Sequence, residues 1–167
     1  QVAVTATVSQ SLTFSISDNT IGFGTLSASA AQYATGNAVG DSSEVEAHTI
    51  IIGTNASNGY TATVKGATLT SGAYTITALG SNTASSAGTE QFGLRMTATG
   101  GSGAVTAPYA ASGFAYTGTA GAAAQVSSAS GASSNTTYSV RYLANITSST
   151  EAGSYTATLT YVATGNF

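Results

Sequence analysis

Apolar and polar side chains alternate in short runs along almost the whole chain. Val2, Val4, Ala6 and Val8 take every second position near the start, and Leu12–Ser17 repeats the pattern. A period of two with β-branched residues predicts strands that bury one face. The pattern as a whole predicts about nine or ten short strands. The further runs of this kind are Ile21–Leu26, Thr49–Ile52, Tyr60–Val64, Tyr74–Leu79, Phe92–Thr97, Phe114–Thr117, Tyr138–Ile146 and Tyr155–Val162.

Clusters of Gly, Ser and Asn separate these runs and predict turns, as at Asn58-Gly59. Two Ala-rich stretches, Ala28–Ala34 and Ala120–Ser130, are interrupted by Ser and, in the second, by Gly. We interpret both as loops, together with Thr35–Ser43. No stretch predicts a long helix. The sequence therefore predicts an all-β fold, a single immunoglobulin-like or jelly-roll β-sandwich with an extended N-terminal strand.

The alternation also predicts which side chains fill the core, because every second residue of a half-buried strand points inward. We expect the large apolar residues of the strongest runs to be buried. They are Leu12, Phe14, Ile16, Phe23, Ile50, Ile52, Val64, Phe92, Leu94, Met96, Val140, Tyr142, Leu159 and Tyr161.

Charge is scarce in this chain. Only 5% of the 167 residues are Asp, Glu, Lys or Arg, whereas 42% are hydrophobic. An ordinary globular domain has about 25% charged residues. The surface of such a chain is either covered by copies of itself or exposed as a coat rich in hydroxyl groups. With Lys65, Arg95 and Arg141 as its only cations and a net charge of −3, the chain is not expected to bind nucleic acid.

Cysteine is absent, which excludes disulfides and thiol chemistry. No apolar stretch approaches the roughly 18 residues of a membrane-spanning helix. The chain begins at Gln1 rather than at Met. Together with the composition, this start leads us to expect an exported, extracellular protein whose signal peptide has been removed.

Residues that could carry catalysis are few. His48 is the only histidine, and no Gly-x-Ser-x-Gly motif accompanies it. Six acidic residues and the absence of Trp argue against the carboxylate pair and aromatic cleft of a glycoside hydrolase. We therefore expect no enzymatic activity and no cofactor.

One acidic cluster stands out, formed by Asp41, Glu44 and Glu46, with His48 close behind. In an extended strand, residues 44, 46 and 48 would project from one face. Two interpretations remain open. The charges protect a solvated strand edge from unwanted pairing, or the carboxylates of Asp41, Glu44 and Glu46 bind Ca²⁺. We expect no catalytic site there under either interpretation.

Three Asn-x-Ser/Thr sequons, at Asn55, Asn135 and Asn145, are candidates for glycosylation. Nine tyrosines supply rings for a core or for an interface between subunits. They also leave open the alternative of a carbohydrate-binding or adhesin domain on the cell surface.

The order of the segments resembles that of surface-fibre subunits. A Phe-Gly pair after a short strand, and the closing pattern Ala-Gly-x-Tyr-x-Ala-x-Leu-x-Tyr of Ala152–Tyr161, are similar to chaperone–usher pilins and spore coat U-type domains. TasA/camelysin-type biofilm fibre proteins are similar in style. The characteristic pilin cysteines are absent. The resemblance implies a sandwich that leaves a groove, which a terminal strand of the neighbouring subunit fills by donor-strand complementation.

The first ten residues suit the donor role. They alternate, carry no charged side chain and contain no Pro, so they can add to a sheet edge through main-chain hydrogen bonds. We therefore predict a donor extension at residues 1–10, with Val2, Val4, Ala6 and Val8 as inserted residues, and a β-sandwich domain at residues 11–167. The predicted function is that of a homopolymeric filament or pilus subunit. A sheet-forming, S-layer-like envelope protein is a further alternative.

Overall fold

Strands and loops make up the whole chain in the computed structural model, which describes residues 1–167. The all-β prediction is confirmed. The structure contains no helix with the length and apolarity needed to cross a membrane. The strands are β1 (Leu12–Ile16), β2 (Gln32–Tyr33), β3 (His48–Thr54), β4 (Tyr60–Lys65), β5 (Thr70–Ser71), β6 (Tyr74–Thr75), β7 (Gln91–Gly100), β8 (Ala104–Val105), β9 (Ala124–Ala129), β10 (Ser133–Asn145) and β11 (Thr160–Gly165).

Two antiparallel sheets contain most of these strands. In the first, β10 is central: it pairs with β3 and β2 and also with β7, and β1 lies at the edge beside β3. The second sheet has the order β11–β4–β9–β8. Strands β5 and β6 form a small separate ribbon. Thus β1 ends one sheet and β11 ends the other, and each pairs with a strand on one side only.

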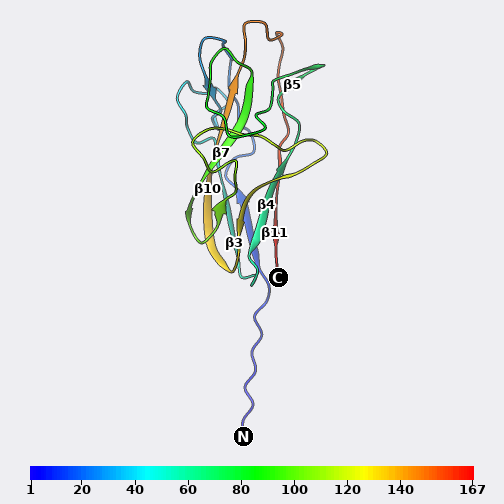
Figure 1. Ribbon diagram of the computed structural model, residues 1–167. Coiled ribbons are helices and arrows are strands. Elements are labelled where there is room, and N and C mark those ends of the chain that lie inside the picture. Colours follow the sequence, from blue (N-terminus) through cyan, green and yellow to red (C-terminus); the bar gives the residue numbers. More distant parts are fainter.

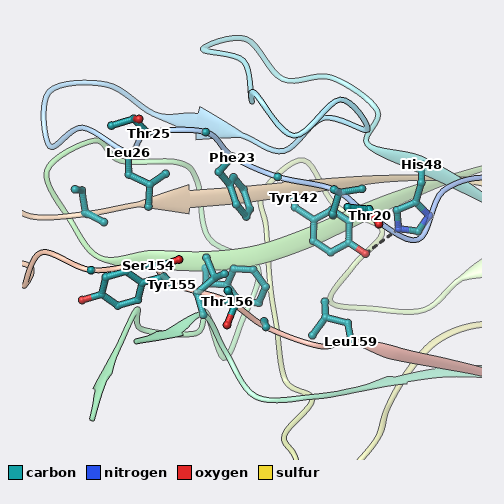
Figure 2. Close-up of a pocket in the computed structure, with 18 of the residues that line it drawn as sticks. Thr20, Phe23, Thr25, Leu26, His48, Tyr142, Ser154, Tyr155, Thr156 and Leu159 are labelled. Carbon is teal, nitrogen blue, oxygen red and sulfur yellow. Dashed lines mark hydrogen bonds between the residues drawn. The ribbon is translucent and has the colours of Figure 1, made fainter. Parts of the chain in front are cut away.

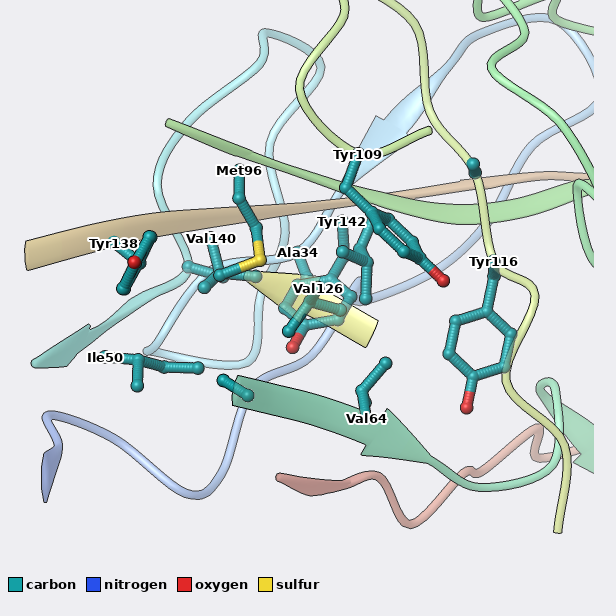
Figure 3. Packing of buried hydrophobic residues seen from close by; sticks show 14 of the residues in the cluster. Ala34, Ile50, Val64, Met96, Tyr109, Tyr116, Val126, Tyr138, Val140 and Tyr142 are labelled. Atoms are coloured by element: carbon teal, nitrogen blue, oxygen red, sulfur yellow. The ribbon is translucent and has the colours of Figure 1, made fainter. Parts of the chain in front are cut away.

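The core lies between the two sheets (Figure 3). Ile50, Val140 and Met96 from the first sheet face Val64 and Val126 from the second. Alternating burial along β3, β4 and β10 matches the alternation in the sequence, because successive side chains of a strand point to opposite faces.

Buried tyrosines pair their hydroxyl groups across the core. The hydroxyls of Tyr60 and Tyr138 lie 2.6 Å apart, and the Tyr116 hydroxyl donates to the Gly66 carbonyl at 2.8 Å. Burial raises the pKa of Tyr116 to about 12. These polar groups therefore stay neutral and bonded inside an apolar interior.

The predicted core is only partly correct. Ile50, Ile52, Val64, Phe92, Leu94, Met96, Val140 and Tyr142 are buried, as expected. Phe23, Leu159 and Tyr161 are half-buried. The β1 side chains Leu12, Phe14 and Ile16 remain 36–38% exposed, because β1 is an edge strand that only β3 accompanies.

Several predicted segments differ from the structure. The predicted loop Ala28–Ala34 contains β2, and of the predicted strand Tyr74–Leu79 only Tyr74–Thr75 forms a strand. The predicted strand Phe114–Thr117 makes isolated bridges only. Part of the Ala-rich stretch Ala120–Ser130, which we expected to be a loop, forms β9 and pairs with β4 and β8. The run Ile21–Leu26 makes isolated bridges only. Along Tyr155–Val162, the ladder with β4 begins only at Thr160. The last two segments have the composition of strands but lack a continuous partner.

The first ten residues leave the body of the protein as an extended segment (Figure 1). They form no strand pairing within their own chain, and Val2, Val4 and Val8 are 85–90% exposed. The segment continues the direction of β1 along the long axis of the molecule, and the C-terminus lies at the same end of the body (Figure 1).

Candidate functional site

A groove of about 1100 Å³ opens above the adjacent ends of β1 and β11. One wall is the segment that follows β1, Asp18–Leu26, and the other is the segment that precedes β11, Glu151–Leu159. The two walls run in opposite directions, because the chain leaves the N-terminal end of the body along β1 and returns to it along β11 (Figure 1).

The walls are extended but largely unpaired. Within Asp18–Leu26, Gly22 exchanges two 3.0 Å hydrogen bonds with Thr35, and Phe23 forms an isolated bridge with Val39. Within Glu151–Leu159, Thr156 alone is paired, with Thr70 at 2.9 and 3.0 Å. The other peptide N–H groups of both walls donate to no backbone carbonyl. Each wall therefore resembles a sheet edge that can accept another strand.

The lining of the groove combines apolar side chains with hydroxyl groups. Of its 25 lining residues, 13 are hydrophobic. In Figure 2, Phe23 and Leu26 come from one wall, whereas Tyr155 and Leu159 come from the other. The only formally charged lining residues are the acids Asp18 and Glu151, since no Lys or Arg lines the groove. A strand without charge, in which apolar and polar side chains alternate, therefore suits this surface better than an acidic strand would.

No protein-family model, curated protein or solved structure matches this chain. Two features of the molecule itself, the groove and the projecting strand, therefore carry the functional inference.

A buried polar cluster lies at the end of the groove nearest β1. His48 is 6% exposed, and its Nε2 lies 2.9 Å from the Tyr142 hydroxyl (Figure 2). The Tyr142 hydroxyl in turn bonds to the Tyr161 hydroxyl. The Nδ1 atom of His48 is buried without a partner. Burial raises the pKa of Tyr142 and Tyr161 and lowers that of His48, so all three side chains are neutral at pH 7.

His48 should make the stability of the protein depend on pH. Burial lowers its pKa below 6.5, against the opposing influence of the Thr49 backbone and the carboxylates of Asp18 and Glu46. Between these two pKa values the unfolded chain binds more protons than the folded one, so the free energy of unfolding rises with pH. We expect this contribution to be complete above pH 6.5 and to be lost as the pH falls towards the lowered pKa.

Urea denaturation at a series of pH values measures this effect. The variant His48→Gln should show a weaker pH dependence in the window just below 6.5, while the carboxylates continue to titrate at lower pH. Equal slopes for the two proteins in that window would show that His48 is not responsible.

The acidic cluster does not form the arrangement expected from an extended strand. Glu44 bonds to the Nε of Arg95 and lies 3.4 Å from the Nε of Arg141. His48 begins β3 and turns inward to Tyr142, so it does not share a site with Glu44. The structure contains no group of three or more His, Cys, Asp or Glu side chains placed to hold a metal ion, so Asp41, Glu44 and Glu46 do not together form a set of Ca²⁺ ligands.

The three sequons lie in different environments. Asn145 is buried, and its Nδ2 donates to Gln91 at 2.8 Å, so a glycan there would displace this contact. Asn135 is exposed. Asn55 is exposed as well, but its Nδ2 donates to the backbone carbonyl of Ser9 at 2.7 Å.

Reasoning from the sequence singled out residues 1–10, which the structure shows as an extended and unpaired segment, but it did not locate the groove. Alternation in Ile21–Leu26 and Tyr155–Val162 identified strand-like segments without showing that neither has a full partner. The available signal was Gly24 on the first wall and Gly153-Ser154 on the second, because Gly within a strand-like run weakens pairing within the subunit.

Proposed function

We propose that this protein is the structural subunit of an extracellular filament or pilus, and that it polymerises head-to-tail by donor-strand complementation. The observation that carries the proposal is that two incomplete features occur together in one chain. An extended strand has no partner, and a groove with two unpaired walls has no strand. A second copy of the chain supplies what each lacks.

The chemistry of the strand suits the groove. Val2, Val4, Ala6 and Val8 share one face of the extended segment, and this face fits the apolar part of the lining. The segment Val2–Val8 has as many residues as Thr20–Leu26 on the first wall. Its peptide groups add main-chain hydrogen bonds along the walls. Each buried Val contributes roughly 25 cal/mol per Å² of apolar area.

The shape of the molecule favours a contact between different copies. The strand leaves one end of the body, and the groove lies farther along the body beyond β1 (Figure 1). A strand that entered its own groove would have to reverse direction at Ser11, where backbone and side-chain bonds hold it in line with β1. Contacts between unlike surfaces of identical subunits propagate into a filament.

The same geometry gives the inserted strand a direction. A donor subunit that is stacked on the end of the body opposite the termini inserts its strand into the groove with residue 1 pointing towards β1. Its chain then runs parallel to Thr20–Leu26 and antiparallel to Ala152–Leu159. Val8 lies near Leu26 and Tyr155, and Val2 near His48, at the buried end.

The composition supports an exported homopolymer. A chain with 5% charged residues has few groups to keep a free surface hydrated, and burial between subunits reduces that surface. A coat of Ser and Thr hydroxyls remains on the outside of the filament. We place the assembly on the cell surface.

Electron microscopy of the purified protein tests the proposal directly. We expect filaments from the full chain and none from a chain that lacks residues 1–10. A synthetic peptide of residues 1–10 should bind the shortened chain and raise its melting temperature, as a ligand of the folded state does. A peptide with Val4 and Val8 replaced by Asp serves as the matched control.

Three results would contradict the proposal. They are filaments from the shortened chain, sheets in place of filaments, and a full-length protein that stays monomeric at high concentration. The last result, together with binding to glycans, would favour the carbohydrate-binding alternative.

A further inference from the structure

Asn55 connects the projecting strand to the body of the protein. It follows Thr54, the last residue of β3, where the ladder between β3 and β1 ends with the pair of Thr54 and Leu12. Beyond that pair, the Asn55 Oδ1 accepts a hydrogen bond from the N–H of Ser11 at 2.8 Å. Its Nδ2 donates to the carbonyl of Ser9 at 2.7 Å.

These two hydrogen bonds take the place of those that the backbone of one more residue of a partner strand would make. In an extended chain, the C=O of residue 9 and the N–H of residue 11 point to the same side, where a neighbouring strand would meet them. The amide of Asn55 offers one donor and one acceptor to this pair. The Ser11 carbonyl is held as well, since it accepts from the Thr54 hydroxyl at 2.8 Å and from the Asn55 N–H at 3.3 Å.

We propose that Asn55 fixes the direction in which the donor strand leaves the subunit, and that it thereby sets the stiffness of the filament. This inference rests on the proposed function. In a donor-strand filament, residues 9–11 form the covalent link between a subunit and the strand that it inserts into its neighbour. Without the amide, this link is a short polar segment that can pivot.

The surroundings of the link make Asn55 the main restraint. The hollow beside it, of about 250 Å³, is lined by Val8, Ser9, Gln10, Asn55, Ser57 and Phe167. No side chain other than that of Asn55 forms a hydrogen bond to the backbone of residues 1–10. Residues before Ser9 have no restraint of this kind. The Thr54 hydroxyl holds only the Ser11 carbonyl, so Asn55 is the one side chain that also holds the strand beyond Ser11.

The test compares Asn55→Ala with Asn55→Asp and with Asn135→Ala as the matched control. Asp keeps the acceptor for the Ser11 N–H and loses the donor to Ser9. Asn135 is an exposed asparagine on the neighbouring strand β10, and its side chain makes no hydrogen bond. All variants should keep the melting temperature of the parent protein, because the link lies outside the core.

The first readout is the motion of a spin label on a cysteine introduced by Gln10→Cys, which is unique because the chain has no cysteine. In the monomer, Asn55→Ala should release the label, Asn55→Asp should release it in part, and Asn135→Ala should leave it unchanged. A label that moves equally in all of these proteins overturns the inference, whether or not filaments form.

The second readout is the persistence length of filaments in electron micrographs. We expect it to fall by roughly half or more in Asn55→Ala, because a held link becomes a flexible one, and to stay unchanged in Asn135→Ala. Filaments of Asn55→Ala that are as straight as those of the parent protein overturn the inference while leaving donor-strand assembly intact. If the parent protein forms no filament at all, the proposed function fails, and the label alone decides whether Asn55 orients the strand.

Discussion

Replacing Val4 and Val8 together with Asp should abolish polymerisation and leave the folded monomer intact. In the filament, both side chains would enter a groove whose only charged lining residues, Asp18 and Glu151, are also acidic. Each new carboxylate would be buried without a partner at a cost of at least about 2 kcal/mol. The affinity between subunits should therefore fall by roughly a thousandfold or more. Sedimentation velocity and electron microscopy measure this loss.

The monomer should tolerate the same change, because Val4 and Val8 lie outside the core of their own subunit and are almost fully exposed. The matched control is Thr5→Asp with Thr7→Asp, which adds the same charge to the opposite face of the strand. That variant should still polymerise, although more weakly. Normal filaments from the Val4 and Val8 variant would mean that the strand does not insert with this face.

Replacing Phe92 with Ala should lower the free energy of unfolding by about 3–5 kcal/mol, a large loss for a single substitution. Phe92 lies on β7, is 2% exposed, and packs edge-on against Tyr116 with ring centroids 5.2 Å apart. Removing its ring leaves a cavity in the core beneath the groove. For a protein whose total stability is on the order of 5–15 kcal/mol, this is a substantial fraction.

Urea denaturation of the chain without residues 1–10 measures this loss, so that association does not contribute. The control is Val162→Ala on the edge strand β11, where the side chain is about half exposed and the change should stay within about 0.5 kcal/mol. A loss below about 1 kcal/mol for Phe92→Ala would mean that the surrounding core closes over the space.

The sequence predicted the all-β fold and the central strands well, because in these strands the alternation follows directly from the burial of one face. Val64 and Val140 alternate with polar residues, and both are buried in the core of the structure. Strand β9 escaped prediction because Ala and Ser carry little of the β-branched signal. Its burial depends on β4 and β8, which are distant in the sequence.

Of the candidate site, only the extended segment of residues 1–10 was predictable from the sequence. An alternating run states which face of a segment is apolar, but not whether a partner strand lies beside it. For this reason β1 was expected to be buried and is exposed, and Ile21–Leu26 was expected to be a paired strand and is a groove wall. His48 was placed with the neighbouring acids by spacing along the chain, whereas its true partner, Tyr142, lies on β10.

The separation of strand and groove along the long axis gives a donor-strand filament two chemically different ends. At one end the last subunit keeps an open groove, and at the other the last subunit keeps a free strand (Figure 1). This asymmetry does not depend on filament length. A protein that carries such a strand but no groove would terminate one end, and a protein that carries such a groove but no strand would terminate the other. Trace amounts of either would set the length of the polymer without any change in the subunit itself.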